Sequence, residues 1–388
     1  MCLPRQEATF IKTNSLLVVA LILGLVPSVS AEEPDDAKTA GRIFHSMVWT
    51  GKEMLVWGGG SQGMFFGHGL RIDPTGKERT VMASKGAPSG RWGHAAVWTG
   101  TEMIIWGGRS QFATENHFDD GARYDPGTDK WNAITAEKAP TARSQMAAVW
   151  TGEEMLVWGG FGDKAVAWNT GGRYNPKTDK WLPMSTVDAP EARAEPLSVW
   201  TGKELLVWGG ITPDLKRTLR SGARYNPTTD KWTPILSADT APAVWGSRAV
   251  WTGSEMIVWG GSHRNGDDEI NEVTRSGAAY DPVKNRWRTL KLEGAPSARF
   301  FHDAVWTGTR LIVWGGGDQG GENNPAKHFD DGGEYDPIKD RWSELTWEKR
   351  PTARGMHSAV WTGRGMMIFG GSTGGSTAFS DAVLWEPR

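Results

Sequence analysis

The chain has 388 residues with 43 Lys and Arg against 45 Asp and Glu, so its formal net charge is −2 at pH 7. This balance gives no bulk electrostatic reason to expect nucleic acid or an anionic membrane as a partner. The 50 glycines and 23 tryptophans, with a single cysteine at Cys2, indicate a turn-rich fold stabilised by packing rather than by disulfides.

The first 31 residues have the pattern of a secretory signal peptide. Arg5 and Lys12 precede an uncharged apolar run from Leu16 to Val26, and a small-residue cleavage site ends at Ala31. We therefore expect a secreted or periplasmic protein cleaved near Ala31, with residues 32–41 as an N-terminal segment and candidate closing strand. No stretch approaches the roughly 20 apolar residues that a spanning helix needs, so no transmembrane segment is predicted.

From Arg42 onward, one pattern recurs seven times: an apolar strand ending in Val-Trp-Thr-Gly, then a second apolar strand ending in Trp-Gly-Gly, or Phe-Gly-Gly in the last copy. The leading tryptophan returns every 49 to 55 residues, at Trp49, Trp98, Trp150, Trp200, Trp251, Trp306 and Trp361. A period of this length is typical of one propeller blade. Residues 42–388 are accordingly predicted to form one seven-bladed propeller.

Each repeat is predicted to fold as four antiparallel strands, a to d, with strand a innermost. Thr-Gly turns join a to b, and Asp-Pro or Asn-Pro turns join c to d. Both fixed turns then lie on one face, and the loops of variable length lie on the other, where binding sites usually form. The seventh copy stops at Arg388 after Trp385-Glu386-Pro387, so the last blade is expected to lack its own outer strand.

The Gly-Gly after an apolar strand, the aromatic-Asp-Pro turn and the Trp seven residues after the Tyr resemble the Kelch repeat. The whole chain is similar to the superfamily typified by the central domain of galactose oxidase. That resemblance implies fold rather than activity, because Kelch propellers include enzymes, adhesion modules and protein-binding scaffolds. The lack of cysteine in the mature chain excludes the copper and Tyr–Cys chemistry of galactose oxidase. The exported sialate mutarotases (N-acetylneuraminate epimerases) are similar in compartment and fold and need no cofactor.

A repeated arginine stands seven residues before the leading tryptophan, with Val244 replacing it in the fifth blade. Its members are Arg42, Arg91, Arg143, Arg193, Arg299 and Arg354. Such a ring could bind a carboxylate or sulfate; the alternative is a structural tie from strand a to a neighbouring loop. His45, His94, His302 and His357 follow three residues later, in only four blades. Four histidines spread around the ring do not predict a metal site.

Aromatic residues that break the repeat lie beside the predicted channel mouth: Phe44, Trp92, Trp245, Phe300 and Phe301. Rings of this kind stack on the C–H faces of sugars while nearby polar groups bind the hydroxyls. The alternative is that they pack on one another and close the mouth. With the arginines Arg42, Arg91, Arg299 and Arg354, the residues Trp92, Trp245, Phe300 and Phe301 form the predicted ligand-binding set.

One loop sequence, His-Phe-Asp-Asp-Gly, occurs twice, at residues 117–121 and 328–332. Its carboxylates and histidine could bind a cation or perform acid–base chemistry. Alternatively, Asp120 and Asp331 stand where other repeats have Thr or Ser, a position suited to hydrogen-bonding the turn.

The sequence thus predicts an exported, monomeric propeller that binds a carbohydrate or protein ligand on its variable face, without a cofactor or metal. The alternative is a sugar-acting isomerase or lyase, similar to the mutarotases. Its candidate acid–base groups are His94, His302, Asp120 and Asp331, with Arg91 and Arg299 holding an anionic substrate.

Overall fold

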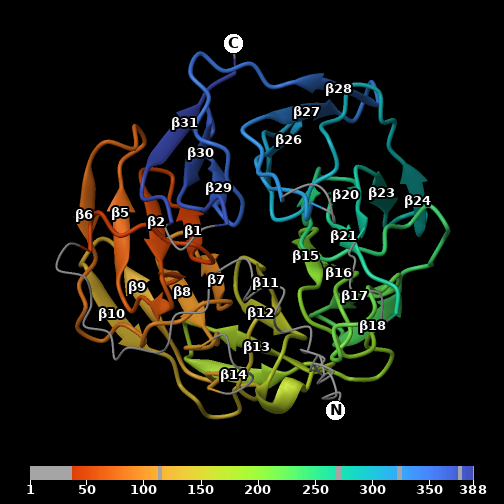
Figure 1. Ribbon diagram of the computed structural model, residues 1–388. Coiled ribbons are helices and arrows are strands. Elements are labelled where there is room, and N and C mark those ends of the chain that lie inside the picture. Colours follow the sequence, from red (N-terminus) through yellow and green to blue (C-terminus); the bar gives the residue numbers. More distant parts are fainter. Residues whose placement is uncertain (1–36, 112–115, 267–271, 321–325, 375–377, 388) are drawn as a thin grey trace, which may run out of the picture.

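The computed structural model describes residues 37–111, 116–266, 272–320, 326–374 and 378–387. The predicted signal peptide and the start of the segment 32–41 lie outside these residues. The fold prediction is confirmed: sheets of antiparallel strands follow one another around a ring, in chain order (Figure 1). The innermost strand of each sheet contacts the innermost strands of both neighbours, and the last contacts the first, which closes the ring.

Six blades have four strands. They are β1 (Ser46–Trp49), β2 (Met54–Trp57), β5 (Gly69–Ile72) and β6 (Arg79–Val81) in blade 1; β7 (Ala95–Trp98), β8 (Met103–Trp106), β9 (Gly121–Asp125) and β10 (Lys130–Ala133) in blade 2; β11 (Ala147–Trp150), β12 (Met155–Trp158), β13 (Gly171–Asn175) and β14 (Lys180–Pro183) in blade 3; β15 (Leu197–Trp200), β16 (Leu205–Trp208), β17 (Gly222–Asn226) and β18 (Lys231–Pro234) in blade 4; β19 (Arg248–Trp251), β20 (Met256–Trp259), β23 (Gly277–Asp281) and β24 (Arg286–Thr289) in blade 5; and β25 (Asp303–Trp306), β26 (Leu311–Trp314), β27 (Gly332–Asp336) and β28 (Arg341–Glu344) in blade 6. Blade 7 has three strands: β29 (Ser358–Trp361), β30 (Met366–Phe369) and β31 (Ala382–Trp385).

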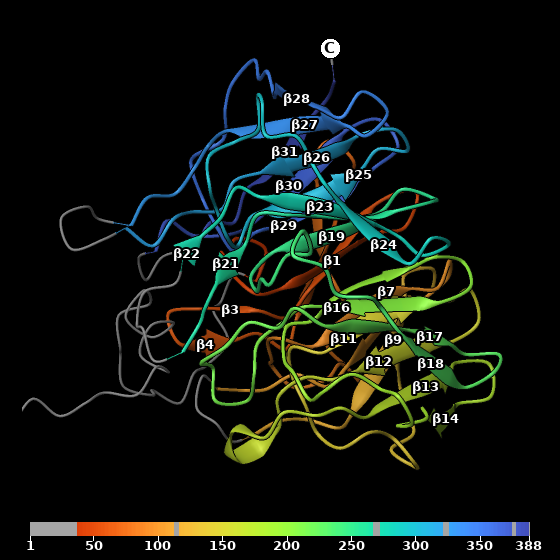
Figure 2. The same cartoon turned by 90° about the vertical axis from the view of Figure 1, so that its right-hand side faces the viewer.

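The b–c loops carry the only further elements in the described residues: the hairpins β3 (Gly60–Ser61) with β4 (Met64–Phe65) and β21 (Ser262–His263) with β22 (Glu272–Val273), and the short 3₁₀ helix η1 (Asp163–Ala165). Figure 2 shows both hairpins and η1 on one side of the disc, with the c–d turns on the other. We call these the variable face and the turn face.

The core lies between blades. All four residues of every strand b are buried, because each such strand is covered by the neighbouring blades. At five successive junctions the strand b tryptophan packs on the strand d tryptophan of the next blade, with ring centroids 4.6 to 5.9 Å apart: Trp57 on Trp131, Trp106 on Trp181, Trp158 on Trp232, Trp208 on Trp287 and Trp259 on Trp342. Tilted aromatic pairs of this kind add to the energy of burial.

Blade 7 has no strand d among the described residues, so no strand d tryptophan of blade 7 packs on Trp314. Trp347, from the loop after β28, takes its place at 5.9 Å from Trp314 and reaches Trp385 at 6.3 Å. Trp385 also donates its indole N–H to the Thr346 carbonyl oxygen at 3.0 Å, as Trp131 does to Ala83 at 2.8 Å. Two tryptophans outside the repeat pattern therefore fill this part of the core.

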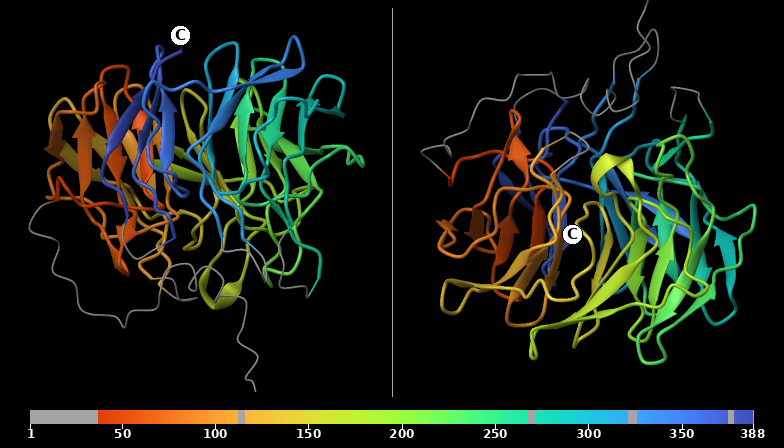
Figure 3. Two further views of the ribbon diagram at one scale, coloured as in Figure 1. Left: turned by 45° about the horizontal axis from the view of Figure 1, so that its top comes forward. Right: turned by 90° about the horizontal axis from the view of Figure 1, so that it is seen from below.

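The candidate closing strand is not present in the described part of its segment, because residues 37–41 form a turn and coil. The ring closes here through other contacts. The Arg42 amide donates to the Phe379 carbonyl at 3.1 Å, and the Arg79 guanidinium lies 5.7 Å from the Phe369 ring centroid. Figure 3 shows the blue strands of blade 7 beside the red and orange strands of blade 1.

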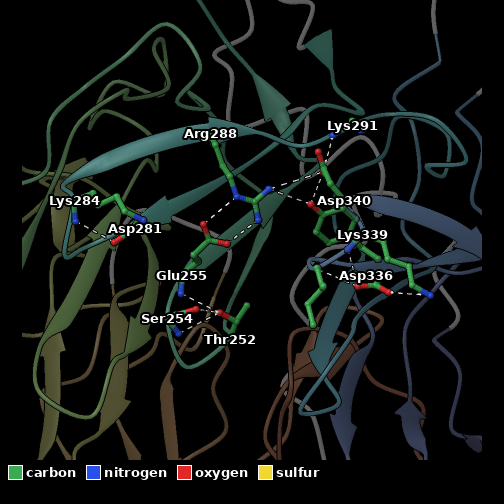
Figure 4. A network of polar contacts seen from close by, with 12 residues as sticks. Thr252, Ser254, Glu255, Asp281, Lys284, Arg288, Lys291, Asp336, Lys339 and Asp340 are labelled. Carbon is green, nitrogen blue, oxygen red and sulfur yellow. Dashed lines mark hydrogen bonds and ion pairs between the residues drawn. The ribbon is translucent and has the colours of Figure 1, made fainter.

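Polar contacts cross the junctions near the turn face. In blade 5, Ala279 occupies the strand c position that carries Arg224 in blade 4, and Arg288 from strand d binds Glu255 instead, at 2.7 Å (Figure 4). Arg288 also donates to the Tyr335 hydroxyl of blade 6 at 3.2 Å. The partners in this network are residues of blades 5 and 6, so we assign it to the scaffold.

Candidate cavity at the channel mouth

Seven residues at the channel mouth, one from each blade, have left-handed backbone conformations. Each stands two positions after the repeated arginine or Val244, where the chain turns from the variable face into strand a. Their φ values lie between 50° and 64°: Phe44, Gly93, Gln145, Glu195, Gly246, Phe301 and Met356. For the five non-glycine residues this conformation costs about 1–2 kcal/mol each, so the surrounding structure must impose it.

Hydrogen bonds between blades hold these residues in place. The amides of Gln145 and Glu195 donate to the carbonyl oxygens of Gly93 and Gln145 at 2.7 and 2.9 Å. On the other side of the ring, the Phe301 amide donates to Gly246 and the Met356 amide to Phe301, at 2.8 and 3.0 Å. All seven residues line one cavity of about 340 Å³, which we call the mouth cavity.

One side of the mouth cavity is apolar. Phe44 and Phe301 both line it and are partly exposed, with ring centroids 6.3 Å apart. Behind them, Trp92 packs on Phe44 at 5.1 Å and is 2% exposed. Trp245 packs on Phe301 at 5.5 Å and is 9% exposed.

The predicted aromatic set is therefore divided by the structure. Phe301 lines the cavity, together with Phe44 and Trp92. Trp245 and the 5% exposed Phe300 support Phe301 from behind, and neither lines the cavity. The aromatic residues pack on one another, as the alternative interpretation expected, but they leave the cavity open.

The opposite side of the mouth cavity is polar. The Gln145 amide donates to Glu195 across the junction between blades 3 and 4. Burial raises the pKa of Glu195, and the nearby Arg248 and the Gln145 hydrogen bond partly oppose that shift. A carboxyl group can donate a hydrogen bond to a ligand hydroxyl when it is protonated and accept one when it is ionised.

Arg248, the first residue of β19, lines this polar side, and its partner Asp303, the first residue of β25, does not line the cavity. The Arg248 Nε donates to the Asp303 carboxylate at 3.1 Å, and the amides of Ala304 and Ala359 donate to the same carboxylate at 2.8 and 2.7 Å. Burial raises the pKa of Asp303, against the opposing charge of Arg248. Asp303 thereby ties blades 5, 6 and 7 together below the mouth.

The six repeated arginines lie elsewhere. Their side chains are fully buried, none lines the mouth cavity, and each donates from Nη1 to the carbonyl of the first glycine after its own strand b, at 3.0 or 3.1 Å. These hydrogen bonds tie each arginine to the loop after its own strand b. They correspond to the structural alternative that the sequence analysis set against anion binding. Arg42, Arg91, Arg299 and Arg354 are therefore held by the scaffold and are not offered to a ligand in the cavity.

The duplicated His-Phe-Asp-Asp-Gly loops complete this tie in blades 2 and 6. Asp120 and Asp331 form ion pairs with Arg91 and Arg299, both at 2.7 Å. In blade 3 the hydroxyl of Thr170 accepts from Arg143 at 3.1 Å, so the same position carries an acceptor of another type.

The four motif histidines pack between blades. Each lies edge-on against the aromatic residue before Gly-Gly of the preceding blade, at 5.0 to 5.5 Å, as His94 does on Trp57. Burial lowers the pKa of His94 to about 3, and holds those of His45, His302 and His357 well below 6.5, so all four are neutral at pH 7. The structure does not bring His94, His302, Asp120 and Asp331 together in one site.

Within the described ranges, no three or more His, Cys, Asp or Glu side chains are placed to hold a metal ion. No helix in the same ranges is long and apolar enough to cross a membrane.

Comparison with known proteins assigns the chain to a family. Residues 69–324 match the Attractin/LZTR1 β-propeller family, and they make up about two thirds of the chain. The chain belongs to this family of Kelch-type propellers. Kelch propellers typically serve as binding modules, which agrees with an open cavity on a rigid ring.

Two curated Kelch proteins are similar over part of this Attractin/LZTR1-type propeller. An N-(sulfonatooxy)prop-2-enimidothioate sulfolyase of Thlaspi arvense is 33% identical over 105 residues, which is 26% of this chain and 28% of the relative. The Adagio-like protein 3 of Oryza sativa subsp. japonica is 26% identical over 136 residues, which is 34% of this chain and 20% of the relative. The matches thus cover less than a third of either relative.

Four residues of the mouth were not singled out from the sequence: Gln145, Glu195, Arg248 and Asp303. Each of them differs from the residue types that the other blades have at the same position of the repeat. At the position of Arg248 and Asp303, every other blade has Ser, Ala or Leu, and at the position of Gln145 and Glu195 the remaining blades have Phe, Gly or Met.

Proposed function

We propose that this protein is an exported binding module whose mouth cavity holds a sugar or a small sugar-like ligand. The observation that carries the proposal is the division of the cavity into an aromatic side and a polar side. Phe44 and Phe301 offer ring surface for the C–H face of a sugar, and Gln145 and Glu195 offer hydrogen bonds to its hydroxyls. Small-molecule sites combine apolar walls and a few polar groups in this way.

The dimensions favour a small ligand over a protein. The cavity of about 340 Å³ lies at the lower end of the ~300–1,000 Å³ typical of small-molecule sites. A stable protein interface buries about 1,600 Å² in total and is spread over a broad surface, whereas this feature is a single cavity.

A glycan array tests this proposal. The mature wild-type protein is expected to bind one class of glycan, and Phe301→Ala and Gln145→Ala are each expected to weaken that binding about tenfold, or about 1.4 kcal/mol. Val283→Ala is the matched control, because Val283 is 92% exposed on the turn face and should leave binding unchanged. Binding by no glycan at all, or equal binding by Phe301→Ala with an unchanged melting temperature, would refute the proposal.

Export is supported by the sequence pattern of residues 1–31 alone. We expect the protein recovered outside the cytoplasm to begin at Glu32, because cleavage follows a small-residue site. N-terminal sequencing checks this, and a chain that still begins at Met1 would contradict it.

A further inference from the structure

A buried cation, Arg109, stacks on Trp92, which lines the mouth cavity, although Arg109 itself is not among the lining residues. Arg109 follows Gly-Gly in blade 2, where the other blades carry no charge: Gly60, Phe161, Ile211, Ser262, Gly317 and Ser372. Its backbone pairs with that of Trp92 through two hydrogen bonds of 3.0 Å, and its guanidinium carbon lies 4.1 Å from the Trp92 ring centroid. Arg109 is only 9% exposed.

Among the described residues, the Arg109 guanidinium has no hydrogen-bond or ion-pair partner, and its Nε is buried without an acceptor. The repeated arginines differ sharply: Arg299 donates five hydrogen bonds to Ser297, Gly315 and Asp331. Burial lowers the pKa of Arg109 to about 10, so it remains charged at pH 7. A desolvated charge without a partner is costly, and an anion would offset that cost.

The position of Arg109 links it to the mouth cavity. Trp92, on which it stacks, lines the cavity, and so does Glu195, whose charge acts on Arg109 without forming an ion pair with it. A guanidinium fixed on an indole ring presents a planar pair of donors, which suits the two oxygens of a carboxylate or sulfate.

We propose that Arg109 binds the anionic group of an acidic sugar, a carboxylate or a sulfate, whose ring lies in the mouth cavity. This inference rests on the proposed function and narrows it from sugars in general to acidic sugars. Phe44 and Phe301 contact the ring, Gln145 and Glu195 bind its hydroxyls, and Arg109 distinguishes the acidic sugar from its neutral counterpart.

Glu195 gives this site a pH dependence. The groups that act on Glu195 are Arg248, Arg109, the Gln145 amide and the Gly246 N–H, and its pKa lies above the ordinary value. His117, which is near Arg109, has a lowered pKa and is neutral at pH 7. Below the raised pKa Glu195 is uncharged and no longer repels the anion, so a sulfated sugar, which stays ionised, should bind more tightly as the pH falls.

The test uses an array in which each neutral glycan is printed beside its uronic-acid and sulfated forms, followed by calorimetry on galactose, galacturonate, galactose 6-sulfate and the best-binding pair. The wild type should prefer the acidic member at least tenfold. Arg109→Met should abolish that preference and leave the neutral member unchanged, while the exposed control Arg220→Met should change neither. Equal binding of both members by the wild type, or a preference that survives Arg109→Met, would overturn the inference and leave the proposed function intact. Failure of every glycan to bind would remove the proposed function itself.

A second readout does not depend on any ligand. Because the Arg109 guanidinium has no hydrogen-bond or ion-pair partner among the described residues, and Met can still pack on Trp92, Arg109→Met should leave the melting temperature unchanged or raise it. A fall as large as that caused by removing a repeated arginine would show that Arg109 is a scaffold residue and would also overturn the inference.

Discussion

Arg299→Ala is expected to lower the free energy of unfolding by about 3–5 kcal/mol, because it deletes a fully buried side chain and leaves buried acceptors without a donor. The substitution removes five hydrogen bonds and leaves Gly315 and Asp331 without the donor that satisfies their oxygens. It also removes the cation that lies 4.4 Å from the Phe329 ring centroid. Urea denaturation followed by tryptophan fluorescence measures the change.

The control for this prediction is Arg220→Ala. The Arg220 side chain is 45% exposed, and its carboxylate partner Asp239, at 3.8 Å, is fully exposed. Surface pairs of this kind contribute little to stability, so Arg220→Ala should unfold close to the wild type. If Arg299→Ala were no more destabilising than Arg220→Ala, the repeated arginines would not hold the scaffold, and a ligand-binding role would have to be reconsidered for them.

Gly59→Ala is expected to be still more destabilising. It should lower the free energy of unfolding by more than about 4 kcal/mol or prevent folding. Gly59 has a φ of 72°, and an added Cβ would lie against the Ile43 carbonyl oxygen and 2.6 Å from the His45 amide nitrogen. Both are backbone atoms at the start of blade 1, so neither can move without displacing the strand that leads to Phe44. The yield of soluble protein and its urea midpoint measure the effect.

Gly51→Ala separates backbone strain from steric clash. Gly51 has a φ of 93°, yet nothing lies within 4 Å of the position its Cβ would take. Its replacement by alanine should lower the free energy of unfolding by about 1–2 kcal/mol, because alanine is strained in the left-handed conformation. Similar losses in the two variants would mean that the close approach of Gly59 to blade 1 is not what the Gly-Gly motif provides.

The fold could be predicted because it follows from spacings that local chemistry imposes. The interval from Trp49 to Trp57 recurs in every blade because the a–b turn is short, and antiparallel pairing then places Trp49 opposite Met54. The three-stranded last blade also followed from the chain. The packing of Trp347 and Trp385 at that blade could not be predicted, because it depends on contacts between a loop and a strand of different repeats.

The site was harder to predict, because residue type does not reveal which side chains are buried. Arg91 and Trp92 lie where the mouth was predicted, yet one is fully buried under its own blade and the other is 2% exposed behind Phe44. Glu195 gives no motif in the sequence, and it faces the cavity because its φ of 50° turns the chain there. The residues that differ from the repeat indicated where the site lies. Charged residues of this kind were as informative as aromatic ones.

The most direct test of the account is a crystal structure of the mature protein with the tightest-binding glycan from the array. We expect the sugar ring in the mouth cavity, against Phe44 and Phe301, with its hydroxyls bound to Gln145 and Glu195 and an acidic group at Arg109. A glycan bound on the turn face or on the outer edge of a blade, with the mouth cavity empty, would contradict the account.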